Sequence, residues 1–210
     1  MALKFFDSIS TSTPKEDIYR RLGYVRESTF LKEEHIQKTD LYIDESAEYI
    51  QLKGCACRVG VESIDNGVIK LVNDIIFESK DLAKFLLGSK EVLIMGATAG
   101  ELIMNKIQSF SQTNDLARGI VYDASASEIV DGALDWILNF SGRAIVREGL
   151  VLDHRRFSAG YGDFALKNQK VICEFLQMDK IGVKLTKSFL MLPEKSVTAI
   201  SGIRINDESN

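Results

Sequence analysis

The sequence predicts an α+β fold, a mainly antiparallel twisted sheet with helices packed on it, from two observations. Alternating apolar runs flank Asp65-Asn66-Gly67, and an Asn-Gly pair between such runs is a strong signal for an antiparallel hairpin. Helical periodicity then fills long stretches between a few strands, without the strand-helix alternation of a parallel sheet. A parallel nucleotide-binding sheet is the weaker alternative, because Gly96-Ala97-Thr98-Ala99-Gly100 lacks the full glycine pattern of that fold.

Length and composition limit the class of protein. With 210 residues, 45% of them hydrophobic and 27% charged, the chain is long enough to bury a sizeable core. We expect a single domain over residues 1–210, with a helical region over 1–54 and an α+β body over 55–210. Lys and Arg total 26 against 30 Asp and Glu, so the sequence lacks the basic excess that nucleic-acid binding requires.

The sequence also bears on location and on cysteine chemistry. Its longest apolar stretches fall far short of the roughly 20 residues that span a bilayer, so no membrane partner is expected. The first residues lack the pattern of a secretory signal, and three cysteines cannot all pair. We therefore expect a reduced, cytoplasmic protein without a metal site. Cys55 and Cys57 would face one side of a strand, which favours small core residues over a metal or redox pair.

Two helices are expected near the N-terminus. Thr13-Pro14-Lys15-Glu16 combines a capping residue, a proline at the first helical position and a glutamate three residues after the cap, so a helix begins there and ends at Gly23. A second helix is expected from Glu33 to Leu52, with Gly54 ending it.

The rest of the chain alternates short strands and helices. Strands over 56–61 and 68–72 flank the hairpin turn, and Ser79 caps a short helix over 79–87. A buried strand over 91–95 is closed by the glycine turn at 96–100. The remaining predicted elements are helices over 100–112, 116–140 and 168–178, and strands over 183–186 and 196–200.

The segment from Asp153 to Asp163 has the densest set of side chains suited to binding. Two adjacent arginines offer delocalised charge and many hydrogen-bond donors beside two glycines, and Tyr161 can both stack and hydrogen-bond. A ligand with a carboxylate or a purine would need such groups. The alternative is a surface loop with arginine salt bridges.

An ordered set of motifs makes this part of the chain recognisable. The motifs are Arg156-x-Ser158-x-Gly160-Tyr161-Gly162-Asp163, Gln169, Ile181-Gly182-Val183-x-Leu185-Thr186-x-Ser188 and Met191-x-Pro193-x-Lys195-Ser196-Val197-Thr198-Ala199-Ile200. From about Ala97 to Ile203, the chain resembles the activation (AdoMet-binding) domain of cobalamin-dependent methionine synthase. It is most similar to free-standing forms, since the fused domain continues with Pro and Cys where this chain has Gly162-Asp163-Phe164.

The resemblance implies which residues contact AdoMet. They are Asp131, Arg156, Ser158, Gly160 and Tyr161, with no catalytic residue among them. Asp131 stands where the fused domain carries a glutamate, so its side chain is one methylene shorter. A carboxylate there favours the sulfonium and the ammonium of AdoMet, and Arg156 suits the ligand carboxylate. The other interpretation of Asp131 is a solvated helix face shared with Glu128 and Asp135.

The resemblance also implies partners, because the chain lacks the Asp-x-His-x-x-Gly motif that binds cobalamin. Cobalamin would come from a separate methionine synthase or corrinoid protein, and electrons from a donor of the flavodoxin or ferredoxin type. The implied function is reactivation, the reductive methylation of cob(II)alamin on that partner, and whether this chain counts as an enzyme stays open. One alternative is a non-catalytic corrinoid-protein binding module that has lost AdoMet binding. A weaker one is a small nucleotide-binding enzyme that uses the turn at 96–100.

Overall fold

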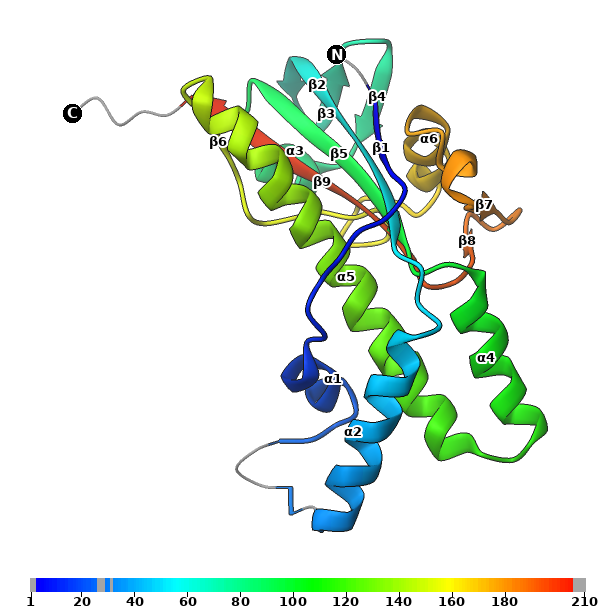
Figure 1. The fold of residues 1–210 in the computed structure, drawn as a ribbon. Coiled ribbons are helices and arrows are strands. Elements are labelled where there is room, and N and C mark those ends of the chain that lie inside the picture. The colour runs from blue at the N-terminus through cyan, green and yellow to red at the C-terminus, as the bar shows by residue number, and fades with distance from the viewer. Residues whose placement is uncertain (1–2, 26–28, 31, 206–210) are drawn as a thin grey trace.

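The computed structural model describes residues 3–25, 29–30 and 32–205 and has the predicted α+β architecture (Figure 1). Its main sheet has seven strands in the order β4-β3-β2-β5-β9-β6, with β1 also paired to β2, and the pairings are antiparallel. The strands are β1 (Lys4–Phe6), β2 (Lys53–Asp65), β3 (Val68–Leu71), β4 (Ile75–Glu78), β5 (Glu91–Thr98), β6 (Leu150–Leu152) and β9 (Ser196–Ile205). A separate hairpin pairs β7 (Lys184–Leu185) with β8 (Met191–Leu192).

The predicted hairpin is confirmed. β2 and β3 pair across Asn66 and Gly67, whose φ angles of 49° and 84° are those of a tight turn that follows the twist of the strands. β4 and β6 were not predicted, because each is only three or four residues long and is defined by its neighbours in the sheet.

The expected helical region over 1–54 needs correction. Residues Lys4–Phe6 form β1, which pairs with β2, and α2 (Glu33–Ala47) ends well before Leu52. Gly54 lies inside β2 rather than at a helix end. A Cβ atom there would come within 2.8 Å of Ile137 and 2.9 Å of Ile9, so glycine is required by close packing.

The start of the first helix also differs from the expectation. α1 spans Lys15–Arg21 with Pro14 at the cap position, and no side chain caps it. Thr13 contributes only its backbone carbonyl, which accepts a hydrogen bond from the Lys15 amide at 3.0 Å. Gly23 follows the helix with a φ of 85°, as a helix-ending glycine should.

The glycine turn after β5 is shorter than expected. β5 continues to Thr98 and pairs with β2 and β9 along this length, so Gly96 lies in the sheet. A Cβ atom at Gly96 would meet the Met178 side chain at 2.7 Å. The turn is reduced to Ala99 and Gly100. Gly100 has a φ of 86° and is the cap residue of α4 (Glu101–Gln112). This removes the glycine-rich loop on which the nucleotide-binding alternative depended.

α5 (Leu116–Arg147) organises the molecule. It has 32 residues, about 48 Å at 1.5 Å per residue, and continues past the predicted end at Phe140. Its C-terminal half lies across one face of the sheet, while its N-terminal half extends past the ends of the strands beside α1, α2 and α4 (Figure 1). Within the described residues, the helices are too short or too polar to cross a membrane.

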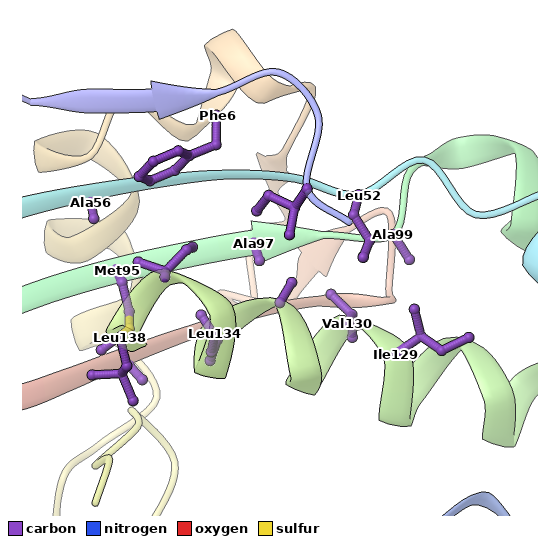
Figure 2. Close-up of a cluster of buried hydrophobic side chains, with 14 of the residues drawn as sticks. Phe6, Leu52, Ala56, Met95, Ala97, Ala99, Ile129, Val130, Leu134 and Leu138 are labelled. Atoms are coloured by element: carbon purple, nitrogen blue, oxygen red, sulfur yellow. The ribbon is translucent and has the colours of Figure 1, made fainter. Parts of the chain in front are cut away.

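The sheet is buried on both faces. Figure 2 shows the core on the α5 side, where side chains of β1, β2 and β5 lie over one stripe of the helix. The α5 residues of this core are Tyr122, Ala126, Ile129, Val130, Ala133, Leu134, Ile137, Leu138 and Ile145. The sequence of this helix predicts one apolar stripe at three- and four-residue steps, made of Ala126, Ile129, Val130, Ala133, Ile137 and Phe140. The first five lie in this core, but Phe140 is partly exposed and packs at the margin against Phe6.

A second core lies on the opposite face, which we call the α6 side. It is covered by α3 (Lys80–Phe85), α6 (Asn168–Phe175) and a 3-10 helix over Met178–Ile181, where one helix over 168–178 was expected. Cys55, Cys57 and Cys173 are all buried in this core as free thiols. Burial raises the pKa of Cys55 to about 12, so the interpretation as small core residues holds.

Candidate ligand-binding site

Arg156 is placed by the edge of the sheet. After β6 the chain continues along β9, and Phe157 and Ile200 exchange backbone hydrogen bonds of 2.9 and 2.8 Å. Neighbouring residues of an extended segment point to opposite faces. Phe157 packs into the core on the α6 side, so the side chain of Arg156 faces α5.

The guanidinium of Arg156 binds α5 through three contacts. Nη2 donates to the carboxylate of Asp131 at 2.8 Å, Nη1 donates to the Asp131 carbonyl at 3.1 Å, and Asp135 Oδ1 lies 3.4 Å from Nη2. Only 19% of the Arg156 side chain is exposed, against 49% of Asp131. The structure therefore brings two of the five predicted ligand contacts together as a half-buried ion pair.

Asp135 is the second carboxylate beside the guanidinium of Arg156. Burial raises the pKa of the Asp135 carboxyl, and the nearby Asp131 charge raises it further, while Arg156 and His154 lower it. The site therefore holds more negative charge than Arg156 alone balances.

A cavity of about 400 Å³ opens beside this ion pair, between residues 10–14 and α5. Asp131 lines it, and three other carboxylates do so as well, those of Asp17, Glu128 and Asp135. Trp136, the single tryptophan of the chain, forms an aromatic part of the wall. Its ring stacks on Phe140 with centroids 5.3 Å apart, which fixes the indole at the cavity. A cation with an apolar or aromatic part suits this lining.

A second cation, Lys195, faces the same helix two turns earlier; it belongs to one of the motifs named above but was not among the predicted ligand contacts. Lys195 Nζ lies 2.7 Å from Asp123 and donates to Ser127 Oγ at 2.9 Å. Asp123, Ser127, Asp131 and Asp135 follow at four-residue steps, so they form one polar stripe along α5. The four-residue spacing is visible in the sequence, so it could have indicated the polar stripe. Which cations face the stripe depends on how β9 packs against α5, and the sequence does not show that.

The loop over residues 157–164, here called the ligand loop, carries the other three predicted contacts. Ser158 is half-buried, while Tyr161 is 69% exposed. Gly160 has a φ of 99°, an angle in the left-handed region that glycine adopts without strain. Ser158, Gly160 and Tyr161 make no hydrogen bond or ion pair with Arg156 or Asp131 in the described structure.

Comparison with known proteins identifies this architecture. No protein-family model and no curated protein sequence matches the chain. Among solved structures, it is similar to the crystal structure of the MetH reactivation domain bound to AdoHcy, with a TM-score of 0.69 and 13% sequence identity. The match covers 100% of this chain and 80% of that one. The chain described here has the fold of the MetH reactivation domain.

Proposed function

We propose that this protein binds AdoMet and supports the reductive methylation of cob(II)alamin on a separate methionine synthase or corrinoid protein. Two findings support the proposal together: the fold, and the ion pair of Arg156 and Asp131 beside a cavity of about 400 Å³. The ion pair is the observation that carries it, because this pair matches the charged end of AdoMet.

The charges of the site complement an α-amino acid. A zwitterion carries a carboxylate and an ammonium on one carbon, and Arg156 and Asp131 present the opposite charges side by side. The ligand carboxylate would replace Asp131 on Arg156, while the ammonium would take the freed carboxylate. The sulfonium would then lie near Asp135 and Glu128, whose charges favour a fixed cation.

The role of the chain in this chemistry is positioning. When bound, AdoMet supplies the methyl group, with the neutral thioether as leaving group. Arg156 and Asp131 hold the amino-acid end, and the cavity wall limits the motion of the rest, so the reacting methyl carbon is kept at a constant place. No proton has to move in the methyl transfer, so the residues of this chain need only bind and orient the ligand.

The proposal includes two external components. Cobalamin would be held by the partner, and a low-potential donor of the flavodoxin or ferredoxin type would reduce it. Partner contact would be transient, since the corrinoid has to be released to other substrates, and transient encounters bury less than about 1,200 Å².

Calorimetry and spectroscopy test the proposal in two steps. AdoMet and AdoHcy should each bind the purified protein at one site per chain. With a cob(II)alamin-loaded partner, a reductant and AdoMet, the absorbance of methylcobalamin should appear, and omission of this protein should prevent it. Equal conversion without the protein, or corrinoid bound tightly to the isolated chain, would refute the proposal.

One observation favours a second candidate, a corrinoid-protein binding module without AdoMet. Arg156 is already neutralised by Asp131 and Asp135, and a ligand has to displace them. This candidate predicts that the protein binds the partner while calorimetry detects no AdoMet binding.

A further inference from the structure

The C-terminal end of the ligand loop is held by the carboxylate of Asp163, which was not among the predicted ligand contacts. Asp163 accepts hydrogen bonds from the Lys80 amide at 2.8 Å, from the Asp81 amide at 3.2 Å and from the Ser79 hydroxyl. In return, Asp81 Oδ2 accepts a hydrogen bond from the Asp163 amide at 3.2 Å. The ligand loop and the start of α3, more than 80 positions apart in sequence, are therefore joined by hydrogen bonds in both directions.

This contact completes the first turn of α3. The amides at a helix N-terminus have no partners within the helix, so side chains must supply acceptors. The Ser79 hydroxyl accepts from the Leu82 amide at 2.9 Å as the local cap. The Asp163 carboxylate accepts from the two preceding amides, those of Lys80 and Asp81. These hydrogen bonds lower the pKa of the Asp163 carboxyl, so it is charged at neutral pH.

Gly162 is adapted to the same contact. A Cβ atom at this position would lie 2.3 Å from Asp81 Oδ2, and its φ is 53°. Any side chain would therefore push Asp81 away from the Asp163 amide. Gly162 and Asp163 therefore act as one unit, because the glycine leaves room for Asp81 and the aspartate binds the start of α3.

The conformation of the exposed part of the loop depends on these hydrogen bonds. Tyr161 is 69% exposed, so packing does not hold its side chain in place. Its position follows from the backbone, where the Gly160 amide donates to the Phe164 carbonyl at 2.7 Å and the Phe164 amide donates to the Tyr161 carbonyl at 3.0 Å. Phe164 itself is fully buried on the α6 side. Asp163 lies between the buried anchor and the exposed tip.

We propose that Asp163 is a positioning residue, which orders the ligand loop through α3 so that Tyr161 is held ready for ligand before AdoMet arrives. The inference rests on the proposed function, since it assigns this order to AdoMet binding. Ordering a loop in advance removes an entropic cost from the binding step. Asp163 itself touches no ligand in this account.

The test combines Asp163→Asn with a matched change at another helix cap. Asp115 caps α5 and accepts a hydrogen bond from the Arg118 amide at 3.4 Å, far from the loop in sequence. Asp163→Asn should weaken AdoMet binding by about three- to tenfold. It should also speed hydrogen exchange at the amides of Gly160 and Phe164, and saturating AdoMet should restore their protection. Asp115→Asn should leave both the affinity and these amides unchanged.

Gly162→Ala provides a second route if Asp163→Asn does not fold, because it disturbs the same contact from the other side. Unchanged loop exchange and unchanged affinity in the folded Asp163 and Gly162 variants would overturn the inference. Equal losses in Asp115→Asn would also overturn it, since the effect would then be general instability. Absence of AdoMet binding in the wild type would instead refute the proposed function, and loop exchange without ligand would still decide whether Asp163 orders the loop.

Discussion

Arg156 and Asp131 lie 25 positions apart in the sequence, and their side chains meet at 2.8 Å between the edge of β9 and α5. The arginine also donates to the backbone carbonyl of Asp131 and lies 3.4 Å from Asp135, so it has three contacts with the helix. A ligand carboxylate has to compete with this arrangement. The strength of that competition underlies the first prediction.

Arg156→Ala should weaken AdoMet binding by about 1.5–3 kcal/mol, the range for a lost hydrogen bond to a charged group. Calorimetry on the folded variant measures this directly. Arg155→Ala is the control, because Arg155 is 70% exposed and pairs with Asp153 rather than with α5. If Arg155→Ala causes the larger loss, the ligand carboxylate binds elsewhere.

Gly160→Val should abolish AdoMet binding. A φ of 99° is strained for any residue with a Cβ atom, and most for a β-branched one, so the loop would have to change its path. Gly142→Ala is the matched control, because Gly142 lies inside α5, where an added Cβ would meet Leu152 at an ordinary 3.8 Å. Normal AdoMet titration of a folded Gly160→Val protein would show that the ligand loop is not part of the site.

AdoMet should change the fluorescence of Trp136. It is the single tryptophan of the chain and lines the same cavity as Asp131, so its emission reports on changes in that cavity. Titration should give the same midpoint as calorimetry, and Arg156→Ala should shift both midpoints together. An unchanged spectrum at saturating AdoMet would place the ligand outside this cavity.

Asp135→Asn should raise the free energy of unfolding at neutral pH. Burial raises the pKa of Asp135 in the folded state, so its ionisation opposes folding progressively as the pH rises above the ordinary value of 3.8, and fully once the pH exceeds the raised pKa. Below the ordinary value of 3.8 the carboxyl is protonated in both states, and the advantage of asparagine should vanish. Thermal unfolding of both proteins between pH 3 and pH 7 measures the difference.

Asp153→Asn should have the opposite effect. The hydrogen bond from Arg155 lowers the pKa of Asp153 in the folded state, so its charge stabilises the fold above the ordinary value of 3.8. This contribution is lost as the pH falls through the lowered pKa. The variant should therefore be less stable than the wild type at neutral pH, and the gap should close in acid. If Asp135→Asn and Asp153→Asn change the free energy of unfolding in the same direction, the assigned causes of the two pKa shifts are wrong.

Much of the fold was accessible from local sequence signals. The hairpin at Asn66-Gly67, the cap at Ser79 and the apolar stripe of α5 each depend on residues that are close in sequence, so their physics is local. The ordered motifs from Arg156 to Ile200 predicted the fold that the structure has. β1, β4 and β6 were not predicted, because strands of three or four residues become strands only when a neighbour supplies their hydrogen bonds.

The arrangement of the site was decided by tertiary structure. The sequence alone determined that Asp131 and Arg156 are candidates for ligand contact, but their pairing depends on how α5 crosses the edge of β9. Likewise, local rules predict that Gly54 ends a helix. The structure shows instead that glycine is needed there because Ile137 and Ile9 pack closely against β2. Asp163 is an ordinary loop residue in the sequence, and it becomes a helix cap because α3 lies beside it in space. Contacts between distant segments follow from the whole fold, which no local pattern encodes.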